Sequence, residues 1–249
     1  MTNRTCIIFC IAVVALVLPA AVFGAEPQCL DCHPDKKENK VVHPAIEMGC
    51  SACHTGSHAG EKPAPKLSAP VPDLCFGCHD QTAFNKKVPH APVAGGMCTS
   101  CHDPHASAQA KLLVAAVPEL CFTCHDVSMI QKKVVHPPVK DGQCLFCHVP
   151  HGSDNAAILS QPLNDLCTNC HDKQSSGKHV IASSEVGDSH PLQGRPDPSR
   201  PGKTLSCISC HNPHASNLAH LFTNEAKSPS SLCLMCHTKV KLSLESPLR

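Results

Sequence analysis

The pattern Cys-x-x-Cys-His occurs nine times, and these nine copies contain every cysteine beyond residue 10. The two thiols of such a motif can add to the two vinyl groups of one porphyrin, and the adjacent histidine can then bind the iron. We therefore expect nine covalently attached haem c groups, each containing one iron. The cysteines expected to attach them are Cys29, Cys32, Cys50, Cys53, Cys75, Cys78, Cys98, Cys101, Cys121, Cys124, Cys144, Cys147, Cys167, Cys170, Cys207, Cys210, Cys233 and Cys236. The motif histidines expected to bind iron are His33, His54, His79, His102, His125, His148, His171, His211 and His237.

Paired cysteines can also bind zinc or form disulfides. Zinc binding would not explain the histidine that ends each motif, and a disulfide scaffold would not repeat one two-residue gap nine times. The spacing therefore favours haem over both alternatives.

The first 25 residues have the features of a secretory signal peptide. Arg4 supplies positive charge, residues 7–18 are apolar, and small residues near Ala25 offer a cleavage site. The apolar run is short for a transmembrane helix. We therefore expect residues 1–25 to be removed, Cys6 and Cys10 with them, and residues 26–249 to be exported without a transmembrane segment. The expected location is the periplasm, or the outer membrane or cell exterior.

Large apolar side chains are scarce in this chain. It has no Trp, no Tyr and 7 Phe, against 23 Pro, 13 Gly and 19 His. The interior would be filled by porphyrins, so the chain without haem should be largely unfolded. The expected fold is mostly irregular with short α-helices and negligible β-structure: an elongated multihaem cytochrome c built on a haem-stack core of repeated two-haem units.

Alternate motifs begin at Cys29, Cys75, Cys121 and Cys167, each 46 residues after the one before. The repeat is thus a pair of motifs, and residues 75–107 and 121–153 are visibly copies of one another. We expect two-haem repeats near 29–74, 75–120, 121–166 and 167–232, and a closing haem in 233–249. Residues 172–206 are an insertion rich in Pro and Gly, predicted to be an irregular loop or hinge, with a docking surface as the alternative.

Ten further histidines lie outside the motifs, and eight of them recur in register with the motifs. One lies between the paired motifs, at His43, His90, His136 and His190, and one follows the second motif, at His105, His151, His214 and, one residue later, His58. We expect these to be the second axial ligands of the irons. Pro104, Pro150 and Pro213 should turn the chain away, so that the histidine after each points to a different haem from the one its neighbour holds.

Two histidines remain as candidates for the second ligand of the haem at Cys233. His220 occupies the place that Lys111 holds in an earlier unit, and His179 lies in the insertion. The sequence does not decide between them. Met48 and Met129 are weaker candidates for axial ligation.

The segment CFTCHD…HPPV…CLFCHVPHGS and its copies resemble the doubled-CXXCH family of multihaem c-type cytochromes, related to the small tetrahaem periplasmic cytochromes of metal- and sulfate-reducing bacteria. The resemblance covers nearly all of residues 29–237. It implies respiratory electron transfer between haems packed closely enough for hopping.

An iron held by two histidines has no open position for a substrate, so the expected function is electron transfer rather than catalysis. The expected partners are other redox proteins: an inner-membrane quinol-oxidising cytochrome as donor and an outer-membrane or extracellular cytochrome or porin complex as acceptor. Two alternatives remain. One is a subunit of an extracellular cytochrome filament, and the other is a multihaem reductase of nitrite, hydroxylamine or sulfur oxyanions, which would need an open iron. Nucleic-acid and nucleotide-binding patterns are absent from the sequence.

Overall fold

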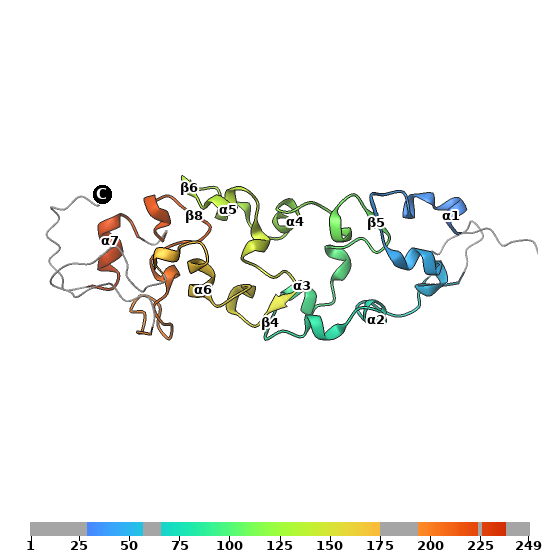
Figure 1. Cartoon of the computed structure of the whole chain (residues 1–249), viewed down its shortest axis with the longest axis horizontal. Coiled ribbons are helices and arrows are strands. Elements are labelled where there is room, and N and C mark those ends of the chain that lie inside the picture. The colour runs from blue at the N-terminus through green and yellow to red at the C-terminus, as the bar shows by residue number, and fades with distance from the viewer. Residues whose placement is uncertain (1–28, 57–65, 175–193, 224–225, 238–249) are drawn as a thin grey trace, which may run out of the picture.

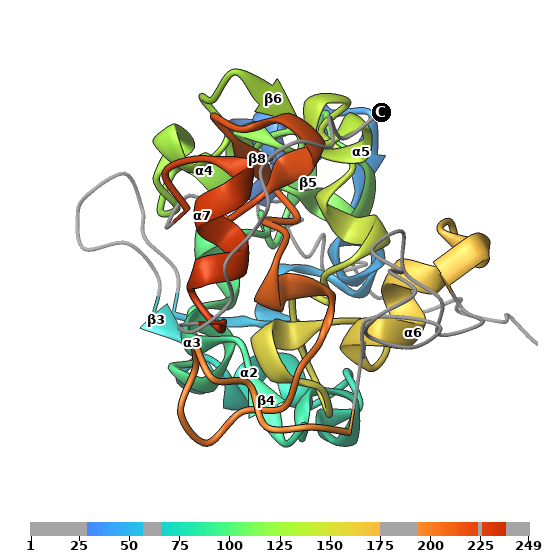
Figure 2. The same cartoon turned by 90° about the vertical axis from the view of Figure 1, so that its left-hand side faces the viewer.

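The computed structural model describes residues 29–56, 66–174, 194–223 and 226–237. The expected signal peptide, residues 1–25, lies outside the described residues. Figure 1 shows an elongated molecule in which the chain advances from α1 at one end to α7 at the other. Units alternate between the two long edges, since α2, α3 and β4 lie on one edge and α4, α5 and β6 on the other (Figures 1 and 2).

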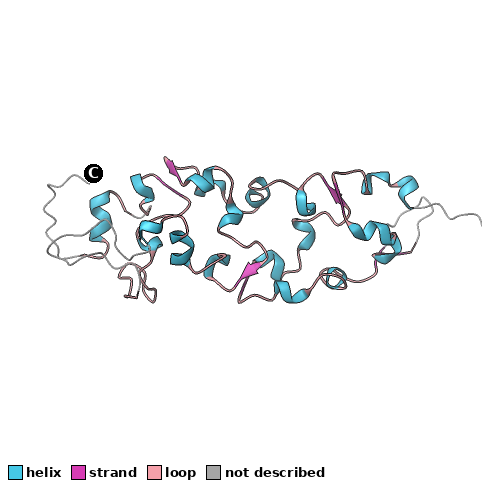
Figure 3. Ribbon diagram, viewed as in Figure 1, coloured by secondary structure: helices cyan, strands magenta, loops and turns pink. Residues whose placement is uncertain are grey.

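The regular elements are short, as Figure 3 shows. The α-helices are α1 (Cys29–Cys32), α2 (Asp73–Phe76), α3 (Ala91–Ala94), α4 (Glu119–Phe122), α5 (Pro137–Lys140), α6 (Leu163–Thr168) and α7 (Pro229–Leu234). The strands are β1 (Val41–Val42), β2 (His54–Thr55), β3 (Lys66–Leu67), β4 (Val88–Pro89), β5 (Ala106–Ser107), β6 (Val134–Val135), β7 (Gly152–Ser153) and β8 (Ala215–Ser216).

Single 3₁₀ turns make up most of the remaining regular structure. They are η1 (Pro34–Lys36), η2 (Pro44–Met48), η3 (Cys50–Ala52), η4 (Gln81–Phe84), η5 (Cys98–Ser100), η6 (Ala110–Leu112), η7 (Val127–Met129), η8 (Cys144–Phe146), η9 (Ala156–Ile158), η10 (Asp172–Gln174), η11 (Cys207–Ser209) and η12 (Ala219–Leu221). The prediction of short helices in a mostly irregular chain with very little sheet is confirmed.

Proline and acidic residues start the helices that lead into the first motif of a pair. Pro72 and Pro118 precede α2 and α4, whose first turns carry Asp73 and Glu119. Proline suits the start of a helix because its missing N–H would be unsatisfied there, and an acidic side chain complements the helix dipole. Each helix therefore begins just before its motif and includes the first cysteine of that motif.

Consecutive units are joined by two-residue antiparallel ladders. β1 pairs with β5, β4 with β7, and β6 with β8, and each pairing connects one unit to the next. In addition, the Lys87 and Lys133 amides donate to the side chains of Asp154 and Asn217 in the following unit. Repeat proteins typically make contacts between neighbouring units, and their stability is approximately a sum over these local junctions.

The described residues contain almost no apolar core of their own. The buried apolar side chains among them are Ala106, Ala215 and Ala226, whereas Met48 and Phe146 are each 68% exposed. Ala106 and Ala215 lie in the ladders, and Gly152 holds the corresponding place in the ladder of β4 and β7. A Cβ atom at Gly152 would come within 2.9 Å of the backbone of Val88 and Pro89, so the two segments approach closely.

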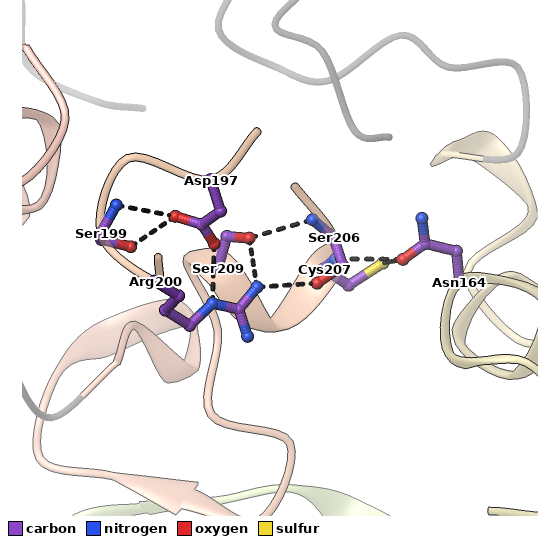
Figure 4. Close-up of polar contacts among 7 residues, drawn as sticks. All are labelled: Asn164, Asp197, Ser199, Arg200, Ser206, Cys207 and Ser209. Atoms are coloured by element: carbon purple, nitrogen blue, oxygen red, sulfur yellow. Dashed lines mark hydrogen bonds and ion pairs between the residues drawn. The ribbon is translucent and has the colours of Figure 1, made fainter. Parts of the chain in front are cut away.

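The described end of the insertion, residues 194–206, is an irregular loop, as predicted, but it is braced by polar contacts. Pro196 and Thr204 form a β-bridge, and Asp197 is 3% exposed. Figure 4 shows that the Asp197 carboxylate accepts hydrogen bonds from Ser199 and, at 2.7 Å, from Arg200 Nε. Arg200 Nη2 also donates to Ser206 and Ser209, so this turn is fastened to the eighth motif. Residues 175–193 of the insertion lie outside the described residues.

Candidate haem-binding row

The two motifs of each pair are held in different backbone conformations. The first motifs begin on short α-helices, α1, α2, α4 and α6, and the closing motif begins on α7 in the same way. The second motifs begin on 3₁₀ turns, η3, η5, η8 and η11. In eight of the nine motifs, all but the one that ends at His54, the amide of the motif histidine donates to the carbonyl of the first cysteine four residues earlier, as at His125 (2.9 Å) and His148 (3.0 Å). Each of these eight motifs is thus one compact turn with its histidine beside its cysteines.

Among the described residues, six motif histidines face a distal histidine from another part of the chain. The ring centroids of these pairs lie 5.9–6.2 Å apart and their planes differ by 5–33°. The pairs are His79 with His43, His54 with His105, His125 with His90, His102 with His151, His171 with His136, and His148 with His214.

This spacing fits one metal ion between two imidazoles. A metal–nitrogen bond of about 2 Å on each side, with each ring centre roughly 1 Å behind its nitrogen, separates the centroids by about 6 Å. Within the described ranges no group of three or more His, Cys, Asp or Glu side chains is placed to hold a metal ion by itself. Each pair therefore offers two axial ligands, as a haem iron requires from its protein.

The distal ligands are exchanged between neighbouring units. At the junction of the second and third units, His90 is directed forward to His125, and His151 is directed back to His102. The two distal residues leave the same ladder side by side, because His90 follows β4 and His151 precedes β7. The outer two junctions repeat this arrangement, and there the amides of His43 and His136 donate to the carbonyls of His105 and His214 at 2.7 and 3.0 Å. Each junction thus positions one histidine of each of two facing pairs.

The second-motif histidines are oriented by a strained loop. Nδ1 of His102, His148 and His211 lies 2.8–3.0 Å from the carbonyl of the residue nine positions later, which is Lys111, Ala157 or His220. These residues and the ones after them have φ between 51° and 58°. Left-handed backbone is costly for non-glycine residues, which suggests a functional reason for keeping it in three copies. Nδ1–H can donate to the carbonyl, which leaves Nε2 free to bind iron.

First-motif sites use a carbonyl from the neighbouring unit instead. Nδ1 of the distal histidines His90 and His136 lies 2.9 and 3.0 Å from the carbonyls of Pro150 and Pro213. The proline predicted to turn the chain therefore also supplies an acceptor that orients a ligand of the adjacent site.

Burial favours the neutral form of four distal histidines. It lowers the pKa of His105, His136, His151 and His214 below the ordinary value, although the Pro213 carbonyl and the Asp103 carboxylate partly oppose this at His136 and His105. A histidine must be neutral to bind a metal. These rings are thus in the protonation state required of an axial ligand.

Cysteines of successive motifs lie close enough to shift one another's pKa. Burial, for example, raises the pKa of Cys75, and the Cys98 and Cys53 thiols raise it further. The neighbouring sulfurs are Cys29 and Cys50, Cys53 and Cys75, Cys75 and Cys98, Cys101 and Cys124, Cys121 and Cys144, Cys147 and Cys170, Cys167 and Cys207, and Cys210 and Cys236. These eight electrostatic interactions connect the nine motifs in the order of the sequence.

The cysteine pair with the largest pKa shifts lies between the seventh and eighth motifs. A hydrogen bond between the Cys167 and Cys207 thiols raises the pKa of Cys167 and lowers that of Cys207 to about 7. Asn164 on α6 accepts hydrogen bonds from the Cys207 amide and thiol at 3.2 and 3.3 Å (Figure 4). All eighteen motif cysteines are free of disulfides.

Not every histidine predicted as a ligand can be followed. His58, His179 and His190 lie outside the described residues. His33, His211 and His237 are described, but none of the six pairs includes them. His220 does occupy the place of Lys111, as the sequence indicated, since both have the same left-handed backbone. Its carbonyl faces His211, and its exposed ring lies 5.7 Å from that of Phe222.

Several functional residues were missed from the sequence. The acceptor carbonyls of Lys111, Ala157 and His220 are backbone groups, so their residue types differ and give no chemical signal. Their constant offset of nine residues from a second-motif histidine is the signal that could have found them. Asp197 and Arg200 were read only as part of a loop rich in proline.

Facing pairs of histidines beside paired cysteines, repeated through described segments that bury almost no apolar side chains, define a protein that holds a row of c-type haems. The sequence profile of the doubled CXXCH motif family matches residues 43–84, 90–130, 136–176 and 200–242. These segments span more than half of the chain, and the chain belongs to this family. The family motif indicates covalently bound haem c and electron transfer.

The matched segments group the motifs differently from the 46-residue period. Each joins the second motif of one unit to the first motif of the next, and the first motif, at residues 29–33, lies outside them. No curated protein matches the chain at a significant level. Among the described helices, none has the length and apolar character needed to cross a membrane.

Proposed function

We propose that this protein carries nine haem c groups, each iron bound by two histidines, and that it conducts electrons along them in the order of the motifs. The observation that carries the proposal is the set of six facing histidine pairs, each combining one motif histidine with one distal histidine at 5.9–6.2 Å. Chance contacts among histidines would not select this combination six times in the same register.

The bound haem supplies an iron that alternates between the ferric and ferrous states and passes single electrons. The chain's own residues do the rest. The motif histidines and their distal partners would hold the iron between them and exclude other ligands, and the backbone carbonyls at Nδ1 would fix the tautomer and the ring orientation. The electrostatic interactions between cysteines of successive motifs support an unbroken row from Cys29 to Cys236.

Two observations support an electron carrier rather than an enzyme. The six pairs leave no free axial position at their irons, and His58, His179, His190 and His220 remain as candidate ligands for the other three motifs. We further propose that the protein works after export, in the periplasm or at the outer membrane, in anaerobic or extracellular respiration. Its donor would be a quinol-oxidising cytochrome of the inner membrane and its acceptor an outer-membrane or extracellular cytochrome.

The test is to count iron per chain in the mature holoprotein and to record its low-temperature electron paramagnetic resonance spectrum in the oxidised state. We expect nine irons, all low-spin, and no carbon monoxide binding to the reduced protein. A high-spin iron that binds carbon monoxide would contradict a pure carrier and indicate the reductase alternative. Fewer than nine irons in fully matured protein would contradict the haem count.

A further inference from the structure

The three Cys-His-x-Pro-His segments that include the ends of the second motifs differ at one position. In each segment a variable residue and a proline precede the distal histidine: Asp103 before His105, Val149 before His151, and Asn212 before His214. The ladders that follow Asp103 and Asn212 are also alike, with Ala106 and Ala215 at the same position. The segments therefore offer three versions of one ligand site that differ chiefly in the polarity and charge of this side chain.

Asp103 and Asn212 build the same turn. Asp103 Oδ1 accepts hydrogen bonds from the amides of His105 and Ala106 at 2.8 and 3.4 Å. Asn212 Oδ1 accepts from His214 and Ala215 at 2.9 and 3.4 Å. The backbone geometry is thus independent of the charge, and the charge of Asp103 needs another explanation.

The carboxylate of Asp103 also lies beside the ligand ring. Its Oδ1 is 3.5 Å from Nδ1 of His105, at side-chain exposures of 43% and 31%. The groups that act electrostatically on His105 are Asp103 and, with the opposite sign, Lys36 and His54. The corresponding rings of His151 and His214 are influenced by other histidines only.

We propose that Asp103 is a positioning residue that lowers the reduction potential of the iron held by His54 and His105 relative to the iron held by His148 and His214. A carboxylate that accepts the Nδ1 proton makes a ligand histidine more basic, and its negative charge favours the ferric state. The inference rests on the proposed bis-histidine haems. It places a low-potential step near the end of the row that contains the first motif.

The chain supplies its own matched control, since Asn212 is the neutral form of the same turn. We would prepare holoprotein with Asp103→Asn and, separately, Asn212→Asp, and compare spectroelectrochemical titrations of the two with that of the unchanged chain. Asp103→Asn should raise the reduction potential of one haem by an amount that corresponds to about a threefold to tenfold change in its redox equilibrium constant. The change is no larger because the carboxylate is partly exposed, which weakens its effect. A tenfold change is about 59 mV for one electron. Asn212→Asp should lower one haem by a similar amount, and each difference curve should amount to a single electron.

The outcomes separate the tuning role from the proposed function. Identical titration curves for the unchanged chain and Asp103→Asn, with all haems present and low-spin, would overturn the role of Asp103 and leave the carrier function intact. A holoprotein without bis-histidine haems would overturn the proposed function itself. Asp103→Ala distinguishes a merely structural role: if only Ala, which also removes the turn, shifts the potential, the charge of Asp103 has no such effect.

Discussion

The junction between the second and third units and the turn before the eighth motif are held together by different means. At the junction, a two-residue ladder brings two distal histidines side by side, and both residues of β7, Gly152 and Ser153, are buried there. At residues 194–209, a buried carboxylate, a guanidinium and three serines form a hydrogen-bonded network (Figure 4). The first region depends on the haems that its histidines would hold, whereas the second depends on ordinary side-chain contacts. We therefore expect two sources of stability in this chain, haem binding and side-chain hydrogen bonds, and each can be tested separately.

Removal of haem should have the largest effect. A chain produced without haem attachment should lose the ladder at the junction, because three buried alanines are the only buried apolar side chains among the described residues and provide little hydrophobic stabilisation. Circular dichroism should show a largely unfolded chain, and amide hydrogen exchange at Ser153 and Lys87 should be unprotected. Retention of protected amides at the junction in the haem-free chain would show that the polypeptide holds this region by itself.

Loss of the Asp197 charge should weaken the second region without removing haem. Asp197→Asn leaves the Arg200 guanidinium without its anion, and we expect a cost of about 2–3 kcal/mol, at or below the low end for a broken buried pair, because the Arg200 side chain is 30% exposed. Thermal denaturation of the holoprotein, with haem content measured alongside, gives both readings. The control is Asp35→Asn, in an ion pair whose side chains are 46% and 63% exposed, which should leave the midpoint unchanged.

The difference in stability between the unchanged chain and Asp197→Asn should depend on pH. Burial raises the pKa of the Asp197 carboxyl, but hydrogen bonds from Ser199, Ser209 and Arg200 outweigh it and hold the pKa well below its usual range. The stabilisation is therefore complete above the unfolded value of about 3.9 and is lost as the pH falls through the lower folded value. The stabilities of the unchanged chain and Asp197→Asn should converge below pH 4. A constant difference down to acid pH would assign the stabilisation to something other than the charge.

A methyl group at Gly152 should have a smaller, local effect. Gly152→Ala places a Cβ atom within 2.9 Å of the backbone of Val88 and Pro89, at a φ of 122°, and should cost about 1–2 kcal/mol. Gly202→Ala is the control from the other region, because its φ is 77° but nothing lies within 4 Å of the added atom. We expect Gly152→Ala alone to disturb the low-spin spectra of the two irons served by His90 and His151. Equal effects of the two substitutions would show that close approach at the ladder is unimportant.

The sequence predicted the chemistry of the site better than its connections. Motif spacing identified the cysteines and motif histidines, and the register of His43, His90, His105, His136, His151 and His214 identified the distal histidines that the structure brings into pairs. The partner of each distal histidine could not be predicted, because it depends on ladders of two residues that have no sequence pattern of their own. The left-handed loops at Lys111, Ala157 and His220 were also invisible, since none contains the glycine that usually signals such a conformation.

In the insertion, the sequence predicted the loop but not the polar contacts that hold it. Its proline and glycine content predicted an irregular loop, but Asp197 and Arg200 turn the described end into the best-braced polar segment described here. Two charged residues three positions apart are common on surfaces, so only their burial distinguishes this pair.

The exchange of distal histidines also decides how such a chain can change in length. A cut between any two units would separate two irons from a ligand each, so neither half would be a smaller working version of the whole. A complete 46-residue copy inserted at an interior junction would instead receive one histidine from each neighbour and return one to each. Duplication from the middle therefore extends the row without altering its ends, whereas every truncation requires a new terminal ligand.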